Sequence, residues 1–433
     1  MIKSPNHNRL VDFYLKKKTS QMKGPRIPLE ADGIQVNFCK NPLCANYGIP
    51  ASTQKQPRGP GSATRNRDQY RISRGSKIPV TQLVCLCCGE VFPVKSNQGI
   101  VEEIKRIGQY LEPTVEPSCP DELCSNHTVG VSAGKSAYQS FGKTRSGSQR
   151  YRCKVCAKLF SVPKPTTGQK QPHKNKTIFK LLMNKTPLKR ICEVADVHME
   201  TIYGKINFLH RQCLAFTADR EQKLLAGKPV RRLYVSVDRQ DYVVNWTRRE
   251  DKRNVTLSAI GSADNETGYV FQMNLNYDPS LDAHQIETDA DSIGDHHHQF
   301  AYREYARLWL PDDYAKSVQR AVRNKSASVD LNGSIESAYH ATTRRDDVEA
   351  SESPSHTRKL PANGMQVHSD YTMYGHFFHL QRLFGGVEKV RFFLDQESGI
   401  RAACLTAFQS KVANRTCDAF YVRINKEMTV DEK

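Results

Sequence analysis

Apolar residues recur with one period before residue 230 of this chain and with a different period after it. Between residues 178 and 209 they return every three or four positions, which is the spacing of one buried face of a helix. Thr186-Pro187 is a helix start signal, and a break at Asp196-Val197-His198 interrupts the pattern. The pattern therefore predicts a helix, a tight turn and a second helix that begins near Met199.

After residue 230 the pattern is that of strands. β-branched and aromatic runs at 233–246, 254–260 and 268–275 are separated by turn-forming residues, so they predict three consecutive antiparallel strands. A polar stretch at about 279–365, partly helical between 300 and 322, interrupts them. We interpret this stretch as an insertion.

The alternation of strands and helices resumes after the insertion. The spacing of apolar residues predicts a helix over 371–384, a strand over 390–395, a helix around Ile400 and a last strand over 419–424. The second half of the chain is therefore expected to fold as three strands followed by helix, strand, helix and strand.

Eight of the 13 cysteines form a frame that occurs twice. Each copy opens with C-x4-C-x-N, with leucine before the second cysteine, and closes with C-x2-C-x3-F. An internal repeat of this detail is hard to obtain by chance. The repeated cysteines are Cys39, Cys44, Cys85 and Cys88 in the first copy and Cys119, Cys124, Cys153 and Cys156 in the second.

Two short pairs of thiolates are the ligand set of a structural zinc ion, which binds four sulfurs tetrahedrally at about 2.3 Å. The loops between the pairs are long, 40 residues in the first copy and 28 in the second. Disulfides and unpaired structural cysteines are the alternatives, and disulfides suit a secreted chain, of which the N-terminal residues show no sign. We therefore predict two structural Zn²⁺ sites, with Cys87 as a bystander.

Charge is distributed unevenly along the 433 residues. The chain has 64 Lys+Arg and 45 Asp+Glu, a net charge of +19. Residues 1–230 hold 38 of the basic and 16 of the acidic residues, whereas residues 231–433 hold 26 basic and 29 acidic residues. A basic excess confined to one half indicates a surface for polyphosphate, so double-stranded DNA is the expected partner. No apolar run is long enough for a membrane helix, and no membrane association is expected.

The predicted helices carry candidate DNA-binding residues. Residues 161–190 contain basic residues and no acidic ones, and the second helix would present polar side chains to a major groove. An ordinary helical hairpin with a solvated lysine face is the alternative. The candidates are Lys185, Lys189, Arg190, Glu200, Thr201, Lys205 and Asn207.

Two acidic residues belong to predicted neighbouring strands, Asp238 to the first strand and Asp395 to the end of the fourth. Neighbouring carboxylates of this kind suit two-metal phosphoryl transfer with Mg²⁺ or Mn²⁺, which usually needs three or four carboxylates. A strand-terminal aspartate is also a common turn or cap residue. The pair is therefore a candidate catalytic site.

These features together resemble a known family. The segment from Tyr138 to Phe160, followed by 186–206, is similar to the zinc-ribbon and helix-turn-helix front end of bacterial insertion-sequence transposases, and this likeness covers about 119–210. Residues 231–433 look like a ribonuclease H-like DDE core, on the strength of Asp238, Asp395 and the strand order.

The resemblance implies a multidomain α+β protein with two small zinc ribbons, a helix-turn-helix and a ribonuclease H-like α/β core with an insertion. It also implies recognition of element ends, metal-dependent DNA strand cleavage and transfer, self-association on DNA and a bacterial cytoplasmic, nucleoid-associated location. The family's third acid follows the last strand, where Glu432 is the candidate and Glu427 and Asp431 are alternatives. A catalytically inactive or truncated DNA-binding element protein, or a transcriptional regulator, is the alternative function.

The expected domains follow one another along the chain. They are a basic segment over 1–34, zinc ribbons over 35–95 and 115–165, a helix-turn-helix domain over 174–215, and the ribonuclease H-like core over 230–433.

Overall fold

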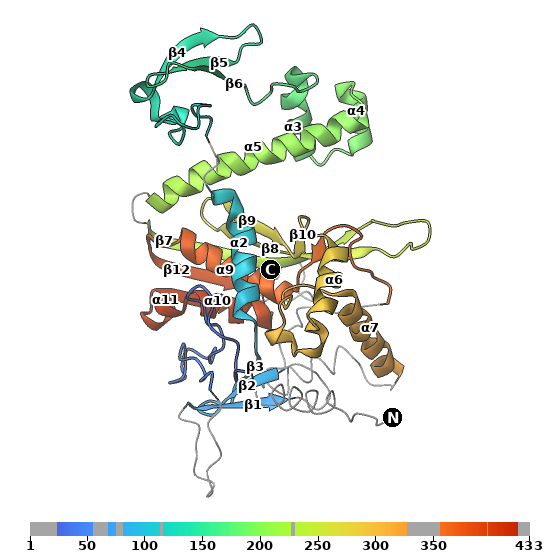
Figure 1. Ribbon diagram of the computed structural model, residues 1–433. Helices are drawn as coiled ribbons and strands as arrows, with labels where there is room; N and C mark the ends of the chain where they lie inside the picture. The colour runs from blue at the N-terminus through green and yellow to red at the C-terminus, as the bar shows by residue number, and fades with distance from the viewer. Residues whose placement is uncertain are drawn as a thin grey trace, which may run out of the picture. The chain divides into compact units, whose positions relative to one another are not determined.

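The computed structural model describes residues 24–54, 68–74, 81–112, 116–226, 230–326, 356–395 and 397–422. The chain divides into two compact units (Figure 1). A core unit combines Met1–Gly108 with Gly227–Lys433, and a middle unit comprises Gln109–Ala226. The first cysteine cluster thus belongs to the unit that contains the late strands. This differs from the expectation that both clusters lie in one N-terminal half. Most of the predicted basic segment, residues 1–34, lies outside the described residues.

A five-stranded mixed sheet is the centre of the core unit, with the order β13-β12-β7-β8-β9. The predicted antiparallel strands are confirmed, and two further strands run parallel to the first of them. The bounds are β7 (Val230–Val244), β8 (Val255–Asp264), β9 (Val270–Leu275), β12 (Val387–Leu394) and β13 (Cys417–Tyr421).

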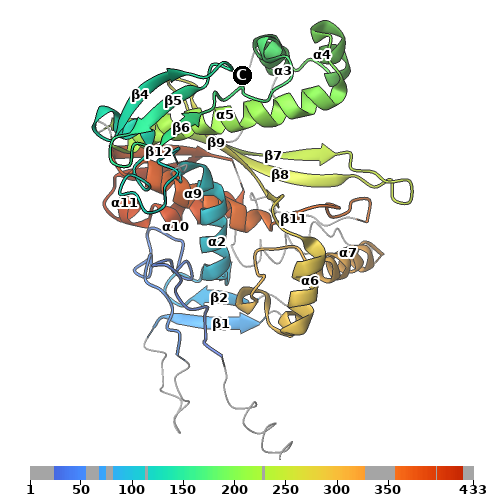
Figure 2. The same ribbon diagram turned by 45° about the horizontal axis from the view of Figure 1, so that its top comes forward.

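Helices cover one face of this sheet. They are α9 (Ser369–Leu383), α10 (Ser398–Ala407) and the short α11 (Gln409–Ala413), as Figure 2 shows. The sheet residues that face them alternate along the strands, as a half-buried sheet requires. Phe392 of β12 packs between Phe377 and Phe408, and its ring centroid lies 5.7 Å from that of Phe377 and 4.8 Å from that of Phe408. The hydrophobic core of the unit therefore lies between this face and the helices.

The first cysteine cluster sits on a small antiparallel sheet of the core unit. Its strands are β1 (Tyr70–Arg74), β2 (Thr81–Cys85) and β3 (Val91–Pro93), and helix α2 (Asn97–Gly108) follows them. Glu103 of α2 is buried and accepts a hydrogen bond from Thr372 of α9 at 2.9 Å. Arg307 bonds both Glu103 and Asp278, at 3.3 and 3.1 Å. Burial of these charges is tolerated because each has a partner.

The insertion is closed at its base by two short strands, β10 (Tyr277–Asp278) and β11 (Met365–Gln366), which pair with each other. Between them lie α6 (Ala283–Ser292) and α7 (Pro311–Ser326). The helix predicted over 300–322 begins only at Pro311, because the preceding segment is extended: Leu308 forms a bridge with Val367, and the amide of Trp309 donates to the carbonyl of Gln366 at 2.9 Å. Residues 327–355 lie outside the described residues.

The middle unit holds the second cysteine cluster and three helices. The cluster sits on β4 (Tyr138–Lys143), β5 (Gln149–Cys153) and β6 (Leu159–Val162). The helices, α3 (Asn175–Met183), α4 (Leu188–Ala195) and α5 (Met199–Ala226), share a core of Ile178, Ile191 and Ile202. The predicted helix, turn and helix are present. Helix α5 continues past the expected end near Leu209, because residues 210–226 contain neither proline nor glycine.

None of the helices in the described ranges combines the length and the hydrophobicity that a membrane-crossing segment needs.

Candidate functional site

The four cysteines of the first frame converge on one point. The sulfur of Cys39 lies 3.5 Å from that of Cys88, and the sulfur of Cys44 lies 3.7 Å from that of Cys85. All four sulfurs lie within 4.8 Å of one another. Cys87 is exposed and takes no part, as expected.

The second frame forms the same cluster. The sulfurs of Cys119 and Cys156 are 3.3 Å apart, those of Cys124 and Cys153 are 3.7 Å apart, and all four again lie within 4.8 Å. None of the chain's 13 cysteines, all in the described ranges, is in a disulfide. A zinc tetrahedron with 2.3 Å bonds has sulfur–sulfur edges of about 3.8 Å, close to these separations. Both clusters could therefore hold a zinc ion.

Each cluster is supported by a buried tyrosine that the sequence analysis did not identify. Tyr70 lies opposite Cys85 in the β1–β2 register, and Tyr138 lies opposite Cys153 in the β4–β5 register. The hydroxyl of Tyr70 accepts a hydrogen bond from the amide of Cys39 at 2.8 Å and donates one to the carbonyl of Ile49 in the opening loop. Tyr138 does the same for Cys119 at 2.9 Å. Both tyrosines stand 15 residues before the third cysteine, which is the signal that could have revealed them.

The asparagine of the C-x4-C-x-N frame bonds a cysteine sulfur in both clusters. The side-chain amides of Asn46 and Asn126 donate to the sulfurs of Cys85 and Cys153, each at 3.4 Å. Burial raises the pKa of these two thiols, but the backbone amides of the closing loop and the asparagines lower it more, to about 7 for Cys85 and about 6 for Cys153. The polypeptide therefore favours the thiolate form of one cysteine in each cluster, whereas burial raises the pKa of Cys39 and Cys119.

The two candidate catalytic acids lie side by side at one end of the central sheet. Strands β12 and β7 are parallel, with Leu394 beside Val237. The amide of Asp395 donates to the carbonyl of Val237 at 3.3 Å, which continues this register and sets Asp395 beside Asp238. Both residues are exposed. Neighbouring residues in register point to the same face of a sheet, so the two carboxylates can share a ligand.

No third acid joins this pair within the described ranges. Among the described residues, only the two cysteine clusters bring together three or more Cys, His, Asp or Glu side chains that could share one metal ion. Buried Glu397, two residues beyond Asp395, pairs with Arg239 at 3.1 Å. The predicted third acid, Glu432, and its alternatives Glu427 and Asp431 lie outside the described residues.

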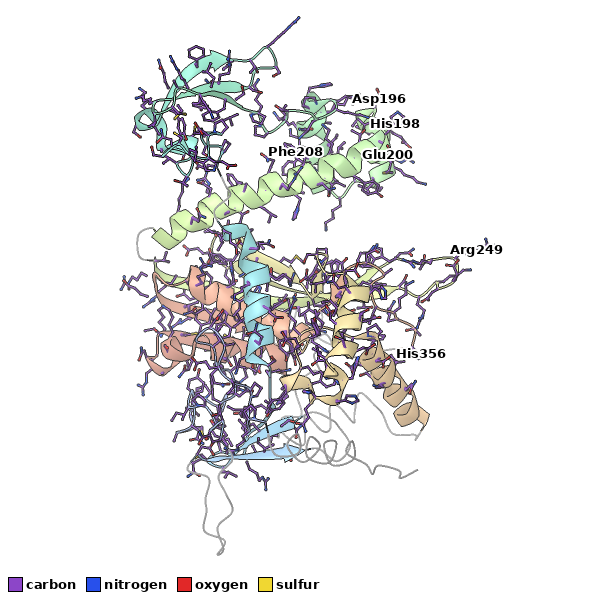
Figure 3. All side chains as sticks on the ribbon, viewed as in Figure 1. Asp196, His198, Glu200, Phe208, Arg249 and His356 are labelled. Atoms are coloured by element: carbon purple, nitrogen blue, oxygen red, sulfur yellow. The ribbon has the colours of Figure 1, made fainter. Side chains whose placement is uncertain are left out.

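Helices α4 and α5 present most of the predicted DNA-binding residues to solvent. Figure 3 shows Asp196 and His198 at the junction of the two helices and Glu200 at the start of α5. Thr201 is partly buried. The exposed candidates are Lys185, Lys189, Arg190, Glu200 and Asn207.

Lys205 does not face solvent, contrary to the prediction. It is 3% exposed, and its ammonium donates to the backbone carbonyls of Lys170 and Gln171 at 2.5 and 3.2 Å. Its position is three residues after buried Ile202, on the inner face of α5. Lys205 therefore fixes the segment that leads into α3.

No protein-family model, curated protein or solved structure matches the chain, so the assignment of a function rests on the geometry described above.

Proposed function

We propose that this chain is a DNA-binding transposase of the DDE type, which holds element ends through the middle unit and cleaves and joins DNA strands at Asp238 and Asp395. The observation that carries the proposal is the register that sets these two acids beside each other on adjacent parallel strands. Asp395 directly follows β12 and Asp238 lies inside β7, and neighbouring carboxylates are the arrangement that metal-dependent phosphoryl transfer uses.

The order of the strands supports a ribonuclease H-like core. Three antiparallel strands are followed by a helix and two strands parallel to the first, and the first strand lies in the middle of the sheet. This is the order on which the resemblance of residues 231–433 depends. It puts the end of β12 next to β7, which is where Asp395 and Asp238 meet.

The middle unit has the charge and shape for DNA. It exposes Lys185 in the turn before α4 and Lys189 and Arg190 in the first turn of α4, where acidic Glu193 pairs with Arg190 at 2.6 Å. A short turn at Asp196, which adopts a left-handed backbone with φ +47°, separates α4 from α5. In a helix-turn-helix the second helix contacts base edges and the flanking basic residues contact phosphates.

Asp238 and Asp395 would hold the catalytic Mg²⁺ or Mn²⁺. Carboxylate oxygens are hard donors that these ions prefer, and both residues are exposed. When bound, such ions activate the attacking water or 3′-hydroxyl and stabilise the leaving oxygen. The chain's own contribution is to place the two carboxylates on rigid neighbouring strands.

A nicking assay tests this proposal. Full-length protein is incubated with Mg²⁺ and a supercoiled plasmid that carries the element ends, and the nicked product is measured. Asp238→Asn and Asp395→Asn should each reduce nicking at least about a hundredfold, because each removes a metal ligand. Asp312→Asn, on exposed α7, is the matched control and should nick normally. Unchanged nicking in both test variants would refute the assignment.

A second function, DNA binding without cleavage, is favoured by the lack of a third acid beside the pair within the described ranges. A regulator or an inactive element protein would use the core as a scaffold. The same assay distinguishes the two functions: the regulator predicts salt-sensitive DNA binding with no metal-dependent nicking by the wild-type chain.

A further inference from the structure

Strands β7 and β8 extend beyond the rest of the central sheet as a two-stranded ribbon. Within the described ranges, β7 pairs with β12 as far as Val237, and β8 pairs with β9 only from Ala259 onward. Residues 241–244 and 255–258 therefore pair with each other. The other edge of β8 is bonded here by Asn276, which donates to the carbonyl of Ser258 at 2.9 Å, and by Gln366, which donates to that of Thr256 at 3.1 Å. Figure 2 shows this ribbon leaving the sheet and ending in a loop, residues 245–254, which we call the ribbon tip.

The ribbon tip is basic, although the half of the chain that contains it is slightly acidic. It carries Arg248, Arg249, Lys252 and Arg253 against Glu250 and Asp251. All four basic residues are exposed. Asp251 is bonded by Arg253 at 2.9 and 3.0 Å, which keeps its pKa well below the usual range, so its charge is already paired. Arg248, Arg249 and Lys252 remain directed at solvent.

A segment more than 100 residues away supports the tip and adds to its charge. The amide of Lys359 donates to the carbonyl of Asn254 at 3.1 Å, and its ammonium donates to the carbonyl of Asp251 at 2.9 Å. Arg253 donates to the carbonyl of Arg358 at 3.4 Å. Figure 3 shows Arg249 at the far end of the ribbon and His356 below it. Arg358 and Lys359 bring the basic residues at the tip to six against two acidic ones, with Lys359 only 10% exposed and 3.9 Å from the carboxylate of Asp251.

The ribbon connects this charge to the acid pair. Asp238 lies at the base of the ribbon and Val244 at the start of the tip, six residues further along β7. At about 3.3 Å per residue, the tip begins roughly 20 Å from Asp238. A DNA duplex rises about 3.4 Å per base pair, so this distance corresponds to about six base pairs. A duplex bound at the acids could therefore reach the tip along the same strand direction.

A solvated loop is the simpler interpretation of an exposed charge cluster. It does not explain why the basic residues collect at the end of an ordered ribbon whose tip a distant segment holds in place. Such a concentration of cations on a projecting edge is typical of contact with a phosphate backbone.

We propose that the ribbon tip binds the phosphate backbone of the DNA duplex that the acid pair acts on. The inference rests on the proposed function, because it takes DNA as the partner. It assigns DNA contacts to the core unit, in addition to those expected of the middle unit.

The salt dependence of DNA binding tests this inference. Full-length protein is titrated with a 40-base-pair duplex of mixed sequence over a range of NaCl concentrations, because phosphate binding is independent of sequence. Arg249→Ala/Lys252→Ala should bind about tenfold more weakly near 150 mM NaCl. The slope of log K against log[NaCl] should fall by about 1.8, because each lost phosphate contact reduces it by about 0.9.

A matched double variant in the same unit is the control. Lys105→Ala/Arg415→Ala removes two exposed cations from α2 and from the turn before β13, far along the chain from the ribbon tip. Its slope should equal that of the wild type. Equal slopes for the two double variants would overturn the ribbon contact while leaving DNA binding intact. A wild-type chain that does not bind the duplex would instead refute the proposed function and the ribbon contact with it.

Discussion

The two cysteine modules share one local structure but have different surroundings. In both, a tyrosine and an asparagine support four sulfurs on a three-stranded sheet. In the first module, the hydroxyl of Tyr47 donates to the carbonyl of Leu405 in α10 at 2.6 Å, and Arg401 of α10 pairs with Glu90 at 3.2 Å. The second module is surrounded by its own residues, and nearly all of β4 is exposed.

This difference indicates that the same motif has two uses. The apolar cluster of the first module includes Ile27, Leu83 and Ala301, the last of which comes from the insertion. Its packing continues into the core unit, so zinc would stabilise a part of that core. The second module buries little besides its cysteines and Tyr138, too little to fold without a metal. It also exposes Phe141, and the guanidinium of half-buried Arg150 lies over its ring, 5.5 Å from the centroid.

The largest predicted effect on structure comes from removal of one metal ligand from each module, and it tests the difference between the two modules. Cys153→Ser should unfold the second module and leave the core unit intact, whereas Cys85→Ser should also loosen α10, because Tyr47 and Glu90 contact it. Loss of structural zinc should cost more than about 5 kcal/mol locally. Hydrogen exchange over 138–162 and over 398–407 measures both effects.

The wild-type protein with and without a chelator is the reference for these exchange rates. If α10 exchanges at the wild-type rate in Cys85→Ser, the first module is not part of the core. Elemental analysis should give two zinc ions per wild-type chain and one per variant.

Removal of the asparagine side chain that bonds a cysteine sulfur should have a smaller effect, which depends on pH and is seen in zinc release. Asn126 helps to lower the pKa of Cys153 to about 6. A lowered folded-state pKa contributes stability that is present above the unfolded-state pKa of the thiol and is lost as the pH falls through about 6. Asn126→Ala removes a bond to a thiolate worth about 1–2 kcal/mol. Protons should then displace zinc from the second module at a pH about one unit higher.

A metallochromic indicator that reports zinc release during acid titration measures this shift. Asn46→Ala is the matched variant of the first module, where the pKa of Cys85 is about 7. Zinc release from the first module of Asn46→Ala should also shift to higher pH. A release curve for Asn126→Ala that coincides with the wild-type curve would show that the amide does not stabilise the thiolate.

The sequence alone predicted the cysteine frames because zinc ligands must recur at fixed spacing. Tyr70 and Tyr138 escaped notice because the loops around them differ in length, which hides their common offset from the third cysteine. The strands were predictable from their β-branched runs, and the positions of Asp238 and Asp395 followed from the strand order.

Contacts that join distant segments could not be predicted in this way. The bond from Tyr47 to Leu405 spans 358 residues, and no local periodicity encodes it. It is one of several long-range contacts, with Arg401–Glu90 and Lys95–Asp370, that join the first module to the core unit. Lys205, by contrast, lies three residues after Ile202, so the helical period already put it on the buried face. Its charge suggested exposure, but nearby backbone carbonyls satisfy it.

The smallest predicted effect compares one ion pair from each module. Glu90 and Arg401 are each 16% exposed and join the first module to α10, whereas Asp121 and Lys158 lie within the second module, with Lys158 54% exposed. Solvent screens an exposed pair, so its coupling should be the smaller of the two. The less exposed pair should contribute about 1–2 kcal/mol, because its charges are partly shielded from water. Double-mutant cycles with alanine, followed by chemical denaturation, measure both couplings. Equal couplings would mean that α10 supports the first module through the backbone bond of Tyr47 and through apolar packing, with no contribution from charge.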